Sequence, residues 1–452
     1  MKTKIRSTRR QFLKAAGLTA ASLAAPPFIR HSRAAGKLTV GLWDHWVPGS
    51  NAVQEAIIQE WAKKNKVEVH VDFITSIGEK LQLTITAEAR AEDGHDIIMM
   101  PTWHPTFVRN RLEDVGEVIK AANKEYGNYT SVADYLFKFD GVWRAVPAPT
   151  GSHNYPIVAR LDLFKQHAGV DLQKVFPADV KKRNKKLVDA WTWENFLGYA
   201  EKLHKAGVPF GNPIGQTTDS QDWLGPLSLS FGSKFVDEKG NITVNSDGTR
   251  AFLEYMKKLT QFMPSEVYAW DDAGNNRWII SGRGSAILNP PSAWTVAKRD
   301  KPEVAAQLWH CDVPIGPKGH FRGSLPYGWG IWKFGKNKAA AKDLLMDMST
   351  KKNVFRLITA SQGYDMPLAP KLLTHDAWIK EGPPEGTQYN YPVRGDETII
   401  VGCMPAPAPI AAQMYNQAVI PNTVARVCAQ GQSIDEAIKW AEQELQGYLR
   451  DV

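Results

Sequence analysis

The sequence has few of the residues that build covalent or metal-based scaffolds. Its three cysteines, Cys311, Cys403 and Cys428, are too few and too scattered for a disulfide framework or a CxxC metal site. Beyond the N-terminal segment 1–34, no apolar run approaches the ~20 residues that a membrane-spanning helix needs. These absences predict a soluble mature chain.

Signatures of catalysis and of phosphate binding are also missing. The stretch Gly282-Arg283-Gly284 lacks the strand and helix context of a phosphate-binding loop, and no Ser or Cys nucleophile has a local signature. His45, His104 and His153 show no HxH or HxxxH spacing that would favour a zinc site. We therefore expect hydrogen-bonding histidines, no metal, no cofactor and no enzymatic activity.

The N-terminus has no acidic residue and eight basic ones within positions 1–34. Arg9-Arg10 is followed by Phe12-Leu13, a run of small and apolar residues over 15–25, and the small residues of Ser32-Arg33-Ala34. This order of charge, apolar length and cleavage chemistry resembles a bacterial twin-arginine export signal. No cysteine follows it to carry a lipid anchor, so a free periplasmic protein is expected.

Removal of the export signal also removes the excess of positive charge. The whole chain has 55 Lys and Arg against 47 Asp and Glu, and the eight basic residues of segment 1–34 account for the difference. The one dense basic run left, at 181–186, has no interleaved aromatics that would stack on bases. The mature chain is formally neutral, so nucleic acid is not an expected partner.

Tryptophan is abundant, with 16 residues, and none of them lies in the export signal. Some must belong to the core. A surplus of this size in a neutral chain suggests aromatic surfaces that meet a flat or cationic ligand.

Hydrophobic periodicity near the start of the mature chain predicts a wound α/β sheet. Alternation over 37–43 and 67–73 indicates two strands, and helical spacing over 51–64 joins them into a βαβ unit with parallel pairing. A helix over 77–91 then leads to a short buried strand at 96–100. Further helices are predicted at 193–206, after 245–247, at 339–349 and at 434–448, with a strand at 284–289.

The loops that follow these strands repeat one chemistry. Asp44-His45-Trp46 and Trp103-His104 should stand at the same edge of one sheet, where open parallel sheets bind ligands. A third loop runs from Asn289 to Trp294, after the strand at 284–289. The adjacent pair Asp271-Asp272 is interpreted as a solvated loop near the rim of the cleft.

Short motifs in a fixed order resemble the extracellular solute-binding proteins of ABC importers, in the maltose-binding-protein-like branch. They are Asp96-Ile97-Ile98, Thr192-Trp193-Glu194-Asn195-Phe196, the stretch 282–289, Gly328-Trp329-Gly330-Ile331, and Ile434-Asp435-Glu436-Ala437. The resemblance implies an α/β, two-lobed periplasmic-binding-protein fold of type II, with a hinge and an interlobe ligand cleft. By the same analogy one lobe comprises 37–148 plus 322–360 and the other 149–321 plus 361–452.

The resemblance, together with the loop chemistry, selects candidate ligand contacts. A sugar ring stacks on aromatic faces and pairs its hydroxyls with planar polar groups, which Asn154 and Gln221 would also provide. The candidate site residues are Asp44, His45, Trp46, Trp103, His104, His153, Tyr155, Trp223, Asn289, Trp294, Tyr327, Trp329 and Asp365.

The expected function is a periplasmic receptor, usually a monomer in this family, that binds a carbohydrate or polyol and delivers it to an ABC permease. Two alternatives remain open. The same receptor role for a polyamine or quaternary amine would use Trp with Asp44, Asp219, Asp222 or Asp365 as an acidic aromatic cage. An exported enzyme that acts on saccharides is the other.

Overall fold

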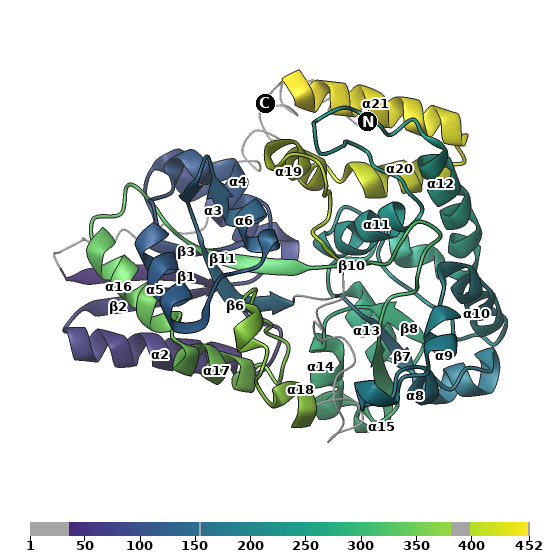
Figure 1. The fold of residues 1–452 in the computed structure, drawn as a ribbon, viewed down its shortest axis with the longest axis horizontal. Coiled ribbons are helices and arrows are strands. Elements are labelled where there is room, and N and C mark those ends of the chain that lie inside the picture. Colours follow the sequence, from purple (N-terminus) through teal and green to yellow (C-terminus); the bar gives the residue numbers. More distant parts are fainter. Residues whose placement is uncertain (1–35, 153–154, 381–397, 451–452) are drawn as a thin grey trace, which may run out of the picture.

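Two main β-sheets organise the chain into two lobes that lie side by side (Figure 1). The computed structural model describes residues 36–152, 155–380 and 398–450, so the predicted export signal lies outside the described residues. The sheet of the first lobe has the order β2 (Glu68–Ile74), β1 (Lys37–Trp43), β3 (Ile97–Pro101), β11 (Leu325–Ile331) and β6 (Val146–Ser152). The sheet of the second lobe has the order β8 (Ala286–Leu288), β7 (Ile157–Arg160) and β9 (Leu308–Cys311).

The first-lobe sheet confirms the predicted parallel βαβ unit. Strand β1 pairs in parallel with β2 over its whole length and with β3 on its other side, whereas β11 runs antiparallel to β3. Every residue of β3 is buried, as expected for a central strand that helices cover on both faces. The helices of the first lobe are α2 (Ser50–Asn65), α3 (Lys80–Ala91) with the preceding 3-10 turn η2 (Ile77–Glu79), α4 (His104–Val108), α5 (Gly116–Tyr126), α6 (Ser131–Phe137), α16 (Lys338–Met348) and α17 (Lys351–Ala360).

A partly buried histidine joins two elements of this lobe. The His95 ring lies 3.1 Å from Asp72 on β2 and 2.5 Å from Glu88 on α3. Burial opposes its protonation, but the hydrogen bonds to the two carboxylates outweigh burial and raise the pKa of His95 to about 9. The ring is therefore protonated at neutral pH and ties the strand to the helix.

Side-chain caps begin the predicted helices of the second lobe. The Thr192 hydroxyl accepts a hydrogen bond from the Asn195 amide, and Ser433 and Glu436 form a reciprocal capping box. The helices are α7 (Leu161–Leu163), α8 (Leu172–Val175), α9 (Lys185–Asp189), α10 (Trp193–Lys205), α11 (Thr218–Ser230), α12 (Asp247–Leu259), α13 (Gly274–Ile280), α14 (Ser292–Asp300), α15 (Pro302–Ala305), α18 (Ala377–Lys380), α19 (Ala408–Asn416), α20 (Val419–Cys428) and α21 (Ile434–Arg450).

The chain passes between the lobes more than once. Strand β6 belongs to the first-lobe sheet and precedes β7 of the second, while β10 (Phe321–Gly323), paired in parallel with β12 (Thr398–Ile400), leads through Ser324 into β11. A short hairpin, β4 (Lys138–Phe139) with β5 (Val142–Trp143), stands before β6. The division of the chain at residues 148, 321 and 360 stays a prediction.

Three apolar clusters form the core of the molecule. One fills the first lobe, one fills most of the second, and a third joins α5 and α17 to α13 and α14 across the lobes. The three cysteines are free thiols. Among the described residues, no helix combines the length and the apolar character needed to cross a membrane.

Candidate functional site

The carboxyl ends of β1, β2 and β3 meet at one edge of the first-lobe sheet, because the three strands are parallel. The loop after β1 places Trp46 there, and the segment after β2 brings Ser76 and η2 to the same edge. Aromatic rings gather beside it. Trp43 stacks on Tyr327 of β11 with ring centroids 5.0 Å apart, and Trp46 meets Trp43 edge-on.

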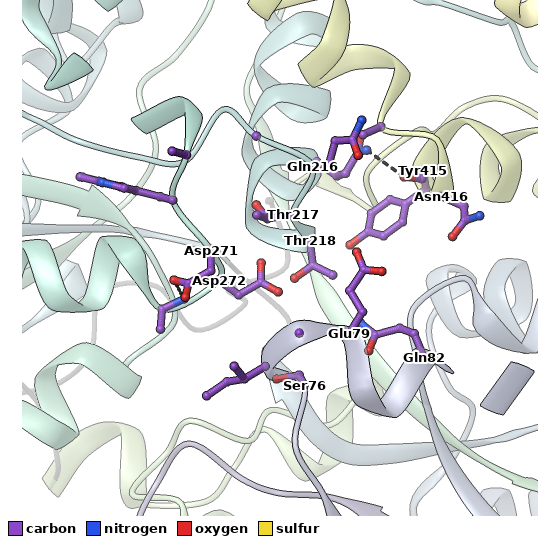
Figure 2. A pocket seen from close by; sticks show the side chains of 18 of the residues that line it. Ser76, Glu79, Gln82, Gln216, Thr217, Thr218, Asp271, Asp272, Tyr415 and Asn416 are labelled. Carbon is purple, nitrogen blue, oxygen red and sulfur yellow. Dashed lines mark hydrogen bonds between the residues drawn. The ribbon is translucent and has the colours of Figure 1, made fainter. Parts of the chain in front are cut away.

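A cavity of about 750 Å³ lies between this edge and the second lobe. Figure 2 shows Ser76, Glu79 and Gln82 reaching into it from the first lobe, opposite Thr218 and Asp272 of the second. The volume falls within the roughly 300–1,000 Å³ of small-molecule sites. Its lining residues are Ser76, Ile77, Gly78, Glu79, Gln82, His104, Gly215, Gln216, Thr217, Thr218, Gln221, Tyr268, Ala269, Trp270, Asp271, Asp272, Ala273, Tyr415, Asn416, Gln417 and Ala418.

A narrow recess of about 20 Å³ continues the cavity inward and shares four lining residues with it. The recess brings aromatic and amide side chains from both lobes to one place. Its lining residues are Trp46, Ser76, Gln82, Thr218, Asp219, Asp272, Asn276, Asn289, Pro290, Ser292, Leu325, Tyr327 and Tyr364.

Acidic groups concentrate on the second-lobe side of the recess. Burial raises the pKa of Asp219, of Asp222 and of Asp272, and their mutual repulsion adds to the effect. Burial also raises the pKa of the Tyr415 phenol, whose hydroxyl donates to Asp222 at 3.1 Å. Asp271, in contrast, is exposed and forms an ion pair with Arg277 at 2.6 Å.

A network of amides fixes the orientation of these side chains. Asn275 on α13 donates to Asp219 at 2.7 Å and to the Leu288 carbonyl at the end of β8. Asn289 in turn donates to Asn276 at 2.6 Å and to Ser292. The floor of the recess is therefore preorganised before any ligand arrives.

Four of the predicted site residues line the cavity or its recess: Trp46, His104, Asn289 and Tyr327. The His104 ring donates from Nδ1 to the Pro101 carbonyl, so Nε2 is left as an acceptor. Burial lowers the pKa of His104 to about 4, which makes the ring neutral at pH 7.

Two further predicted residues form a buried pair between the loop after β1 and the segment after α17. His45 Nε2 donates to Asp365 Oδ1 at 3.0 Å, and both side chains are fully buried. The same Asp365 oxygen accepts from the Gly151 amide of β6, while His45 Nδ1 accepts from the Val47 amide. Neither residue lines the cavity. Asp44 is exposed and accepts from Asn51.

The structure places the other predicted tryptophans within apolar clusters. Trp103, Trp223, Trp294 and Trp329 are at most 1% exposed, and none of them lines the cavity. The Trp223 indole donates to the Pro213 carbonyl, and Lys298 stands over the Trp294 ring. Tyr155 is likewise buried, beneath the acidic residues, and burial and the Asp219 carboxylate raise its pKa. His153 and Asn154 lie outside the described residues.

Sequence reasoning missed much of the cavity lining. Ser76 and Gln82 follow β2, and the parallel pairing of β1 with β2 was the signal that places them at the ligand edge. The segments 215–218, 268–270 and 415–418 carry no comparable signal, because their approach depends on how the second lobe packs. The pair Asp271-Asp272 does stand at the cleft, as expected, with Asp272 facing the cavity.

Metal binding has no evident site in the described part of the chain. No group of three or more His, Cys, Asp or Glu side chains in it is arranged to hold a metal ion. His45 and His104 are engaged by Asp365 and by a backbone carbonyl, respectively. The described cavity therefore offers hydrogen bonds and aromatic faces.

Two α/β lobes with a ligand-sized cavity between them are the architecture of a two-lobed solute-binding protein. Comparison with protein families is consistent with this class. Residues 46–353 match the bacterial extracellular solute-binding proteins, and the chain belongs to that family. No curated protein matches the chain significantly.

Solved structures show the same fold at low sequence identity. Maltose-bound MalE3 of T. maritima has a TM-score of 0.70 at 19% identity, over 91% of this chain and 99% of that one. An ABC-transporter solute-binding protein of Thermotoga lettingae, bound with α-D-tagatose, also has a TM-score of 0.70, at 15% identity over 91% and 99% of the chains. For the maltotriose-bound Thermus thermophilus protein the TM-score is 0.63, at 16% identity over 91% and 100%.

Proposed function

We propose that this solute-binding protein is a periplasmic receptor that binds a carbohydrate or polyol in the interlobe cavity and delivers it to an ABC permease. The observation that carries the proposal is the cavity of about 750 Å³ lined from both lobes by aromatic, hydroxyl, amide and carboxyl side chains. In this proposal the receptor acts as a monomer, holds no cofactor and does not transform its ligand.

The chemistry of the lining suits a sugar. Trp270 and Tyr268 offer aromatic faces on one side of the cavity, while Gln82, Thr218 and Gln216 offer planar amides and a hydroxyl. Sugar rings present C–H groups to the first kind of surface and hydroxyls to the second. The solved relatives that bind maltose, tagatose and maltotriose have the same fold.

Ligand binding would drive closure because the lining is divided between the lobes. A ligand that contacts Ser76 and Glu79 of the first lobe together with Thr218 and Asp272 of the second makes all these contacts only in the closed form. That difference in contacts shifts the population toward closure. The permease can then distinguish loaded from empty receptor, with the ATPase on another chain.

Export through the twin-arginine route belongs to the same proposal. The Arg9-Arg10 segment supports it, together with Phe12-Leu13 and the small, apolar residues over 15–25 that follow. Replacement of both arginines by lysine should leave the protein in the cytoplasm, where cell fractionation would find it. Unchanged periplasmic recovery would point to a different export route.

The ligand class can be tested by a thermal-shift screen of sugars and polyols against the purified protein, followed by calorimetric titration of each hit. A ligand present at about 100 times its Kd should stabilise the folded state by roughly 2.7 kcal/mol. Stabilisation by simple amines alone would contradict the carbohydrate proposal. Release of a cleaved saccharide during incubation would contradict the receptor role.

A further inference from the structure

The acidic and basic side chains of the cleft are strongly out of balance. The cavity and its recess are lined by Glu79, Asp219, Asp271 and Asp272, and no Lys or Arg is among the described residues that line them. His104 does not offset the imbalance, because its pKa of about 4 keeps the ring neutral. A ligand with a carboxylate or phosphate would find no positively charged partner among these lining residues.

The buried carboxylates also lack cationic partners within the protein. In the described part of the chain, no Lys, Arg or His side chain forms an ion pair with Asp219, Asp222 or Asp272. The groups that donate to them are neutral, among them the Asn275 amide to Asp219, the Tyr415 phenol to Asp222 and the Asp219 backbone amide to Asp272. The N-terminus of α11 offsets part of the charge on Asp219 in its first turn, but not that of three neighbouring carboxyl groups.

Buried acceptors without donors supply a second, independent observation. Two such acceptors are Oε1 of Gln221, a cavity-lining residue that is 1% exposed, and Oδ1 of Asp222, the next residue of α11, which is 0% exposed. Neither oxygen has a hydrogen-bond partner among the described residues. His104 Nε2 is a further acceptor. Such a site is complementary to a group that only donates, and an ammonium group has three donors and no acceptor.

We propose that the cleft selects a ligand with a protonated amine, such as an amino sugar or an amine-bearing polyol. Its ammonium group would lie against Asp219 and Asp272, and the aromatic rings of Trp46 and Tyr327 in the same recess add a favourable cation–π surface. This inference rests on the proposed carbohydrate-binding function and specifies the substrate class. It excludes uronic acids and sugar phosphates as ligands.

Matched saccharides that differ in one substituent test the inference. Calorimetric titration of the purified full-length protein would compare an amino sugar with its N-acetyl and hydroxyl counterparts, in the gluco, galacto and manno series and as the corresponding disaccharides. Because hydrogen bonds to charged groups exceed neutral ones by about 1 kcal/mol or more, the amino form should bind at least roughly fivefold more tightly. Equal or tighter binding of a neutral counterpart would overturn the inference and leave the proposed function intact.

The other outcomes separate the two proposals. Binding of putrescine or choline without binding of any saccharide would support the recognition of charge and contradict the carbohydrate function. Absence of binding by every saccharide and amine in the panel would overturn both.

Isosteric variants locate the recognition within the recess. Asp272→Asn and Asp219→Asn keep the shape but cannot ionise to pair with an ammonium group, so each should weaken amino-sugar binding by roughly fivefold and reduce the preference over the hydroxyl counterpart. Glu201→Gln makes the same change on the surface of α10, where Glu201 pairs with Lys205, and should leave affinity unchanged. Retention of the amino preference in both aspartate variants, with folding confirmed by circular dichroism, would contradict the assignment.

Discussion

Substitution of Asp365 tests whether the buried His45–Asp365 pair stabilises the fold and does not contact the ligand. Asp365 Oδ1 accepts two buried hydrogen bonds, from His45 Nε2 at 3.0 Å and from the Gly151 amide at 3.2 Å. Asp365→Ala removes the oxygen that accepts both bonds and leaves two donors without partners in a site where the His45 and Asp365 side chains are 0% and 1% exposed. Each orphaned group costs about 1–3 kcal/mol, so the free energy of unfolding should fall by about 2–6 kcal/mol.

The matched variant Asp365→Asn retains an oxygen at the same position, so it should keep both hydrogen bonds and lose about 1 kcal/mol. Urea unfolding followed by tryptophan fluorescence measures both variants, and calorimetric titration with the identified ligand measures their affinity. Because neither residue lines the cavity, affinity should change by less than about threefold in a folded variant. An Ala variant as stable as the wild type that no longer binds ligand would refute this reasoning and make Asp365 a ligand contact.

Substitutions at four further positions test other parts of the structure. Because the pKa of His95 is raised from 6.5 to about 9, protonation of its ring contributes roughly 3 kcal/mol to the free energy of unfolding. This contribution should be complete below pH 6.5 and should disappear as the pH rises through 9. In His95→Gln the free energy of unfolding should therefore vary less with pH over that range. A Cβ on Gly225 would lie 2.0 Å from the Gly402 carbonyl oxygen, so Gly225→Ala should lower the free energy of unfolding by about 3 kcal/mol or more. A Cβ on Gly447 of α21 would meet open space, so Gly447→Ala should raise the free energy of unfolding by up to about 1 kcal/mol. Urea titration measures both changes. Thr192→Ala removes the cap of α10 and should cost about 1 kcal/mol in the same assay, while Thr192→Ser should restore most of it.

The elements of the fold could be predicted because their signals are local. Alternation over 37–43 and the helical spacing over 51–64 correspond to β1 and α2, and Thr192 capped its helix as expected. The parallel pairing of β1 with β2 and β3 follows from the same patterns, since a βαβ connection leaves little choice. The order of short motifs then indicated the two-lobed fold, which the solved relatives share.

The candidate site was less predictable because the sequence at the end of a strand does not indicate whether the side chains that follow the strand face the cleft or the core. Trp46 and Trp103 both follow first-lobe strands beside a histidine, yet Trp46 lines the recess and Trp103 is buried against Tyr135 and Tyr415. Trp103 is buried because helix α19 of the second lobe packs against α4, the helix that follows Trp103. Tertiary contacts of this kind leave no periodic trace in the chain.

Hydrogen–deuterium exchange with and without a stabilising saccharide is the most direct test that the ligand binds between the lobes. If the ligand occupies the cavity, it should slow hydrogen exchange in both lobes: in segment 76–82 of the first lobe and in segments 215–221, 268–273 and 415–418 of the second. Protection confined to one lobe, or absent from all four segments in a sample that calorimetry shows to be saturated, would contradict the account.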